Sequence, residues 1–389
     1  MLIPATLSLI ALLGINLEAR IVFAIVFILT MIYAYREPKG EYFKLLITAA
    51  TLSALACFMQ KEIVYASLFL SFFYELRKGP MWNIGIFTCA GVVYFTLYDL
   101  FNLILNPIEY LIFISLAGAL SASLIDTVKT SADKRVAMLI AVATTFAIFK
   151  IYIPSTSLES LAIAFFVSFI LSLLALKARI ADESGLMSAT IVGTVTILFT
   201  DLRFFAVLLL FYLVGSITTK YKYSLKLKLG VAEPSGGARG FSNVFGNSLA
   251  PLFFAMQFGV TKDTSFAIAF IASVATALGD TMASEIGKIA NNVYLITNFK
   301  KVRPGTSGGI SVIGEISAFF GCIIVFLFSF ALGLIDLWYV FPVVAAAFLG
   351  IHVDSLLGAT LEQKSYLNNS AVNFLATLFS GFLCYLLIA

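Results

Sequence analysis

The sequence GDTMASEIGK occupies residues 279–288, and KKVRPGTSGGISVIGE follows at residues 300–315. The first part places Asp280 and Glu285 among small residues where a long apolar run ends. The second part is a basic, glycine-rich segment that opens another apolar run. A charge close to hydrocarbon is costly, so ionisable residues in such a place are candidates for a functional role. The stretch therefore predicts two membrane helices that are joined by a polar loop with a functional role.

The composition of the whole chain supports this interpretation. Its mean hydropathy is +1.01, and only 12% of its 389 residues are charged. A soluble protein of this size cannot bury so much apolar surface, so we expect an all-α, polytopic transmembrane helical bundle. The formal net charge of +4 is too small to indicate a nucleic-acid partner.

Apolar runs of helical length predict about 15 spans, some of them short for a full crossing. They are 2–17, 20–36, 43–60, 62–76, 82–101, 108–126, 136–153, 158–176, 186–200, 203–219, 246–260, 265–288, 310–333, 337–353 and 371–388. With the N-terminus inside and alternating spans, 20 of the 25 Lys and Arg residues fall on the inner side. The C-terminus is then outside.

Long, glycine-rich polar loops occur only after the first eight predicted spans. They are 177–185, 220–247, 288–309 and 354–370, and all four fall on the inner side in this topology. We therefore interpret residues 158–389 as a catalytic transmembrane domain and residues 1–157 as accessory transmembrane helices.

Carboxylates in these loops indicate a divalent metal site, because hard cations prefer oxygen ligands. Asp280 is the first candidate, with Glu285 and Asp354 as further ligands, and both Asp280 and Glu285 are also candidate catalytic residues. An alternative is that Asp280 only caps a helix while Glu285 pairs with Lys288 three residues on. In that case neither carboxylate has a role in chemistry.

The segment VRPGTSGGIS, residues 302–311, has the features of a phosphate-binding loop. Backbone N–H groups of a glycine-rich loop before a helix can bind phosphate, and Arg303 adds positive charge as a candidate catalytic residue. The candidate ligands of nucleotide or phosphate here are Lys288, Thr306, Ser307, Gly308 and Gly309. The alternative is an interfacial turn whose basic residues face anionic lipid.

A third motif, GGARGFSNVFGN at residues 236–247, places Arg239, Asn243 and Asn247 four residues apart. On a helix they form one polar stripe, and a guanidinium with two amides can bind phosphates or the edge of a nucleobase. The alternative is a stripe that holds membrane helices together.

Five motifs in order resemble a known family. They are SGLMSATIVG (184–193), GGARGFSNVFGN (236–247), DTMASEIG (280–287), PGTSGGIS (304–311) and DSLLGATLEQ (354–363). Over about residues 158–389 the chain resembles the integral-membrane prenyl-phosphate kinases, typified by the plant phytyl-phosphate kinase. More distantly it looks like dolichol kinase and the CDP-diacylglycerol synthases. One departure is that Arg239 is followed by Gly-Phe-Ser where a more polar run is expected.

The resemblance implies a CTP-dependent kinase that converts a prenyl monophosphate of phytyl or geranylgeranyl type to the diphosphate. It implies Mg²⁺ as the cofactor, Asp280 and Glu285 as the acidic motif, Asp354 as a later acidic motif, and Arg303–Gly309 as the phosphate loop. The expected partners are CTP, a prenyl monophosphate and membrane lipid, at the cytoplasmic face of a prokaryotic cell membrane. A CTP-dependent lipid cytidylyltransferase and a secondary transporter stay open as alternatives, and so does the oligomeric state.

Overall fold

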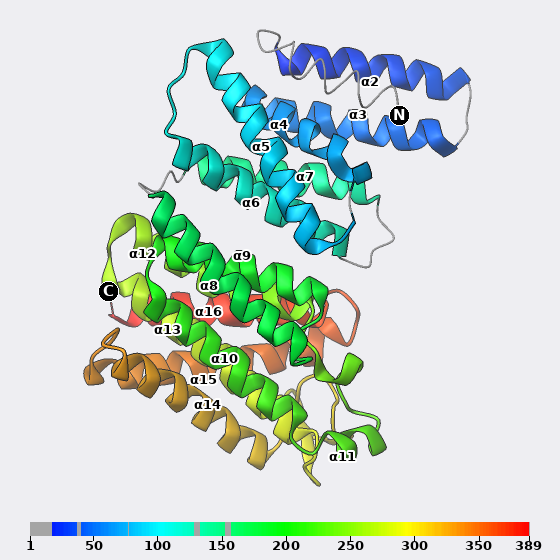
Figure 1. Ribbon diagram of the computed structural model, residues 1–389. Helices are drawn as coiled ribbons and strands as arrows, with labels where there is room; N and C mark the ends of the chain where they lie inside the picture. Colours follow the sequence, from blue (N-terminus) through cyan, green and yellow to red (C-terminus); the bar gives the residue numbers. More distant parts are fainter. Residues whose placement is uncertain (1–17, 37–39, 77, 128–132, 152–156, 389) are drawn as a thin grey trace. The chain divides into compact units, whose positions relative to one another are not determined.

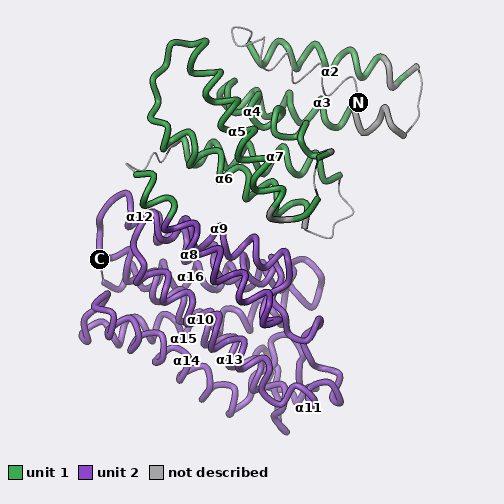
Figure 2. Tube along the Cα trace, viewed as in Figure 1, with its two compact units in different colours: residues 1–162 green, residues 163–389 purple. Residues whose placement is uncertain are grey.

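Helices account for nearly all regular structure in the computed structural model, which describes residues 18–36, 40–76, 78–127, 133–151 and 157–388 (Figure 1). The chain divides into two compact units, residues 1–162 and 163–389 (Figure 2). The predicted first span, 2–17, lies outside the described residues.

The first unit is a helical bundle with an aromatic core. Its helices are α2 Ala19–Arg36, α3 Gly40–Phe58, α4 Lys61–Phe72, the 3₁₀ turn η1 Phe73–Leu76, α5 Pro80–Asn102, α6 Ile108–Thr127 and α7 Lys134–Ile151. Phe23, Tyr65, Phe87, Tyr94 and Phe146 are all nearly inaccessible. Such rings bury large areas, so their packing contributes strongly to holding these helices together.

The second unit contains all the motifs. Its elements are α8 Leu158–Lys177 (shared with the first unit up to residue 162), α9 Glu183–Phe199, α10 Leu202–Lys220, α11 Tyr223–Lys228, η2 Pro234–Gly237, α12 Phe241–Thr261, α13 Thr264–Gly287, β1 Val293–Leu295, β2 Lys301–Val302, β3 Gly309–Ile310, α14 Val312–Ala331, η3 Leu337–Tyr339, α15 Val340–Leu357, η4 Gly358–Glu362 and α16 Asn369–Ile388.

Helix α13 is central to this unit, because it packs against α10, α12, α14, α15 and α16 (Figure 1). Small residues permit the close approach: a side chain on Gly321 of α14 would meet the Cα atom of Gly279 at 2.7 Å. The Thr276 hydroxyl lies 2.6 Å from that of Ser380 on α16. Close packing of small residues with hydroxyl hydrogen bonds is how helices associate where lipid offers no hydrophobic driving force.

Nine helices of the described ranges are long and apolar enough to cross a membrane, and three shorter apolar helices accompany them. This supports the predicted polytopic helical membrane protein. The count of about 15 spans and the placement of the termini stay predictions. One predicted span, 62–76, corresponds to α4 and η1, whose 12 and 4 residues together extend about 26 Å at 1.5 and 2.0 Å each. That is short of the ~30 Å hydrocarbon core.

The link between α13 and α14 is not a plain loop. Strands β1, β2 and β3 form a small antiparallel sheet in the order β2-β1-β3, with Val293 opposite Val302 and Leu295 opposite Gly309. The prediction of a purely helical chain therefore has this local exception. The sheet turns the glycine-rich segment back toward the end of α13.

Candidate functional site

Three of the four long polar loops line one cavity of about 410 Å³ in the second unit. Its walls come from the end of α10, η2, the start of α12, the end of α13, the glycine-rich segment, the start of α14, the end of α15 with η4, and the start of α16. Ligand pockets usually measure ~300–1,000 Å³, so this space suits a small organic molecule or nucleotide.

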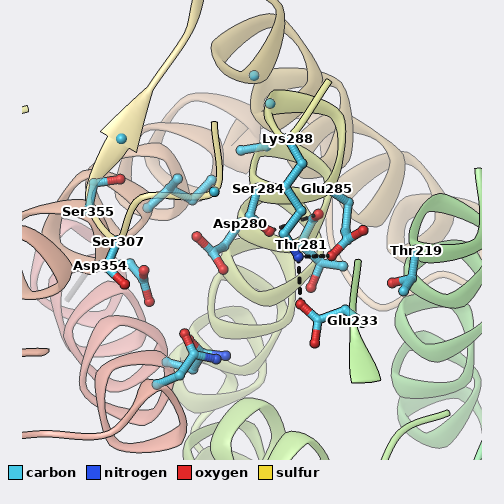
Figure 3. Close-up of a pocket in the computed structure, with 18 of the residues that line it drawn as sticks. Thr219, Glu233, Asp280, Thr281, Ser284, Glu285, Lys288, Ser307, Asp354 and Ser355 are labelled. Atoms are coloured by element: carbon cyan, nitrogen blue, oxygen red, sulfur yellow. Dashed lines mark hydrogen bonds and ion pairs between the residues drawn. The ribbon is translucent and has the colours of Figure 1, made fainter. Parts of the chain in front are cut away.

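Asp280 on α13 and Asp354 on α15 both line this cavity, and Figure 3 shows their side chains approaching it from different helices. Neither is a cap, because α13 continues to Gly287, and α15 to Leu357 with a π turn beyond it. The capping alternative is therefore wrong for Asp280. The charges of the two carboxylates act unfavourably on each other. A cation in the cavity would relieve this repulsion.

Amides on two further helices orient Asp354. With the Asn373 amide assigned from its hydrogen bonds, its nitrogen donates to Asp354 Oδ2 at 3.2 Å and its oxygen accepts from Asn247 Nδ2 at 3.1 Å. Asn247 also donates to the Asn243 carbonyl at 3.0 Å. Asn243 and Asn247 both line the cavity, as the predicted stripe requires. The Asn247 amide, however, serves the protein's own network.

Glu285 also lines the cavity, but its carboxylate is bound by two lysines. Its carboxylate accepts from Lys226 at 2.5 Å. It also accepts from Lys288 at 2.6 Å, and Lys288 donates to Glu233 at 2.5 Å (Figure 3). The Lys226 side chain is fully buried. The pairing of Glu285 with Lys288, which the sequence offered as an alternative, is therefore present. The predicted metal ligand Glu285 is a member of a buried ion-pair network in this structure.

The sequence predicted Lys288 as a site residue but did not single out Lys226. Burial lowers the pKa of Lys288, but the charges of Glu285 and Glu233 outweigh this effect and raise its pKa overall. Lys288 lines the cavity as predicted. Lys226 was missed, because one lysine in a basic loop carries no signal that distinguishes it from its solvated neighbours. Its burial is decided by where α11 packs.

Arg239 is buried, with 8% of its surface exposed, and lines the cavity. Its guanidinium lies 5.1 Å from the Phe211 ring centroid. Its Nε has no hydrogen-bond partner among the described residues, and no ion pair reaches it there. Burial lowers the pKa of Arg239, against the opposing influence of Tyr212, Glu285 and Glu233. A buried, unpaired guanidinium is costly, so an anionic ligand at this position would be strongly favoured.

The SGLMSATIVG motif holds Arg239 in place. The Arg239 N–H donates to the Ile180 carbonyl at 2.8 Å, and its own carbonyl accepts from Asp182 N at 3.2 Å. The Ser184 hydroxyl accepts from the N–H of Phe241 at 3.0 Å. A side chain on Gly185 would meet the Arg239 carbonyl oxygen at 2.1 Å. The fourth polar loop, 177–185, thus contributes to the site by holding the backbone of Arg239.

We expect Gly185→Ala to displace the Arg239 segment, because the added methyl group overlaps a backbone atom that cannot rotate away. Overpacking of this kind costs about 1–3 kcal/mol. Limited trypsin digestion should then cut after Arg239, a bond protected in the parent protein. Gly85→Ala in α5 is the matched control, since nothing lies within 4 Å of its added methyl group. Equal protection of Arg239 in both variants would contradict this role of Gly185.

The glycine-rich segment contributes backbone donors. Thr306, Ser307, Gly308 and Gly309 all line the cavity. The N–H groups of Ser307 and Gly308 have no acceptor among the described residues, whereas Gly309 N–H donates to the Thr306 carbonyl. Gly308 has φ +76°, and a side chain there would meet the Ser355 carbonyl oxygen of α15 at 2.5 Å. Only glycine therefore fits at this position. Two open amides at a cavity wall can receive phosphate oxygens.

Arg303 does not join them. Its side chain is exposed and does not line the cavity, and only its backbone carbonyl is used, by Thr306. The structure therefore leaves the predicted catalytic Arg303 outside the cavity but brings together the other predicted site residues, which are Asp280, Glu285, Asp354, Lys288, Asn243, Asn247, Arg239 and Thr306–Gly309. Glu233, Glu315 and Glu362 line the cavity as well, although the sequence analysis did not select them.

The donor set fits a cation shared with a ligand better than a complete protein cage. No cluster of three or more His, Cys, Asp or Glu residues suited to a metal occurs in the described part of the chain. Mg²⁺, however, is usually held by one or two carboxylates together with substrate phosphates. Asp280 and Asp354 supply two such carboxylates on one cavity.

These features define a multi-pass helical membrane protein whose polar motifs converge on one cavity. The chain belongs to the family described as Integral membrane protein DUF92, whose family model matches residues 166–381.

Three relatives illustrate the range of similarity. The chain is 32% identical over 215 residues to the uncharacterized membrane protein MJ0933 of Methanocaldococcus jannaschii, covering 54% of this chain and 87% of that protein. It is 30% identical over 201 residues to the chloroplastic protein VTE6 of Arabidopsis thaliana, covering 49% and 60%. It is 28% identical over 273 residues to the protein PGR of the same plant, covering 57% and 94%. These matches confirm the family resemblance drawn from the motifs. No solved structure matches the chain significantly.

Proposed function

We propose that this protein is a CTP-dependent kinase that converts a prenyl monophosphate to the diphosphate at the cytoplasmic face of a prokaryotic cell membrane. The observation that carries the proposal is one cavity that is lined by two carboxylates, Asp280 and Asp354, and also by donors for anions. These donors are the buried guanidinium of Arg239 and the open amides of Ser307 and Gly308. The resemblance to the prenyl-phosphate kinases supplies CTP and the prenyl group.

The reaction needs charge neutralisation and alignment more than acid–base chemistry. An oxygen of the prenyl phosphate attacks the γ-phosphorus of CTP, forming a new P–O bond. The bond from that phosphorus to the β–γ bridging oxygen breaks, and CDP leaves with its electron pair. A phosphomonoester is largely ionised at neutral pH, with a second pKa of about 6, so no strong general base is required.

The residues of the cavity divide this work in the proposal. Arg239 and the amides of Ser307 and Gly308 bind phosphate oxygens and stabilise charge that builds up during transfer. Asp280 and Asp354 would hold Mg²⁺, which supplies further neutralisation of the nucleotide phosphates when bound. Asn373 and Asn247 keep Asp354 oriented. The ion pairs of Glu285 fix the end of α13, so that Asp280 faces the cavity.

The test is purified protein in detergent with CTP, Mg²⁺ and geranylgeranyl monophosphate, with products read by mass spectrometry. We expect geranylgeranyl diphosphate and CDP in equal amounts, with little product when ATP replaces CTP. Pyrophosphate and a CDP-linked lipid would instead establish the cytidylyltransferase alternative. Uptake of prenyl phosphate into proteoliposomes without any change in CTP would favour a transporter and refute the kinase.

A further inference from the structure

A second, smaller space adjoins the polar cavity, and Arg239 is the one residue that lines both. This apolar groove lies among α8, α9, α10 and the start of α12. Leu171, Ala189, Val192, Phe205 and Leu209 form much of its wall. Helix α8 closes it by packing on α9, where a side chain on Gly193 would meet Ser168 at 2.6 Å.

The groove is chemically unlike the polar cavity. The Tyr212 hydroxyl, which lies at the groove, forms a hydrogen bond of 2.5 Å with the Ser248 hydroxyl. The guanidinium of Arg239 lies at the border of the groove, and its Nε has no hydrogen-bond partner among the described residues. A space with an apolar body and a cation at one end matches an amphiphile with one anionic head. The polar cavity mixes carboxylates and amides with apolar groups, whereas the wall of the groove is almost wholly apolar.

We propose that this groove is the acceptor-lipid subsite: it takes the isoprene unit next to the phosphate, while Arg239 binds that phosphate at the edge of the polar cavity. The inference rests on the proposed function and specifies where its lipid substrate binds. Arg239 thereby separates the acceptor phosphate from the nucleotide, which would lie toward Ser307 and Asp280.

The size of the groove limits what the protein can recognise. Its volume is about 60 Å³, far smaller than the polar cavity, so it suits only a short apolar segment such as one isoprene unit. The remaining tail would lie in the hydrocarbon of the bilayer, where moving between lipid and lipid-facing helices changes little hydrophobic free energy. The enzyme should therefore recognise the isoprene unit next to the phosphate and accept prenyl tails of different lengths.

The kinetic test compares Leu209→Trp with Leu213→Trp. Both lie on α10 one helical turn apart, but Leu209 lines the groove whereas Leu213 does not and is 46% exposed. We expect Leu209→Trp to raise the KM for geranylgeranyl monophosphate at least about tenfold, as for a blocked hydrophobic subsite. The KM for CTP should stay within about twofold, and Leu213→Trp should resemble the parent protein. Geranyl, farnesyl and geranylgeranyl monophosphates should differ in kcat/KM by no more than about threefold.

A binding test does not depend on turnover. A farnesyl monophosphate analogue with a diazirine on the isoprene unit next to the phosphate should crosslink to α8, α9 or α10. Farnesyl monophosphate should compete, and farnesol should compete weakly. Arg239→Met should remove this preference for the phosphate, whereas Arg303→Met should keep it, because Arg303 is exposed outside both spaces.

The two proposals can fail separately. Formation of prenyl diphosphate combined with crosslinks on α14 or α15, unaffected by Leu209→Trp, would overturn the acceptor subsite and leave the kinase standing. Absence of any diphosphate product, with crosslinks on α9 and α10 that Leu209→Trp abolishes, would refute the kinase and support the groove. A sharp dependence of kcat/KM on tail length would contradict the limit set by the groove volume.

Discussion

Replacement of Asp280 by asparagine is expected to lower kcat/KM for the CTP-dependent reaction by roughly 30- to 150-fold or more, a loss of about 2–3 kcal/mol of transition-state stabilisation. Asparagine keeps the shape of the side chain but removes its charge, and a neutral amide is a poor ligand for a hard cation. Asp280 lies in the interior of α13 and lines the same cavity as the open amides, so no capping role explains its presence. Initial rates at saturating Mg²⁺ measure the effect.

Asp263→Asn is the matched control, because Asp263 caps the other end of the same helix through Ser265 N–H at 2.9 Å. Asparagine caps nearly as well as aspartate, so this variant should keep its activity. Asp354→Asn should act like Asp280→Asn, and the double variant should lose less than the sum of both effects if the two carboxylates hold one ion. Activity of Asp280→Asn within about twofold of the parent would rule out the metal role and with it most of the proposed mechanism.

The largest expected effect on stability is that of Glu285→Ala. It leaves the fully buried Lys226 ammonium with only the carbonyl oxygens of Thr218 and Thr219. Removal of one partner from a buried ion pair typically costs about 3–5 kcal/mol. The free energy of unfolding, measured by denaturant titration in mixed micelles, should fall by this amount.

Two variants separate the ion pair from a general packing effect. Glu233→Ala removes the partner of Lys288 that is 40% exposed, and such pairs contribute about 0–1 kcal/mol. The double variant Lys226→Met with Glu285→Met removes both buried charges and should recover most of the loss, since apolar replacement of a whole pair is often neutral. A double variant as unstable as Glu285→Ala would show that the uncompensated charge is not the cause.

The sequence by itself determined the class of protein and pointed to many of the charged and glycine residues that line the cavity. Mean hydropathy and the length of apolar runs require membrane helices, because hydrocarbon accepts only backbone whose hydrogen bonds are met internally. Asp280, Asp354 and the Thr306–Gly309 segment were found because charges and glycines are rare and costly in such a setting. Nothing in residue order, however, says which face of a helix meets a neighbour, and so Asp280 and Glu285 could not be told apart.

Only the tertiary structure decided which residues the candidate side chains contact. Glu285 meets Lys226 because α11 packs beside α13, which turned a candidate metal ligand into part of a buried ion-pair network. Two arginines that the sequence predicted to act at the phosphate site were separated in the same way. Arg239 is enclosed because Gly215 and Gly185 leave room for its side chain and its backbone, whereas Arg303 lies on an exposed turn. Burial depends on contacts between segments far apart in the chain, and these determine where an unpaired charge creates a binding site.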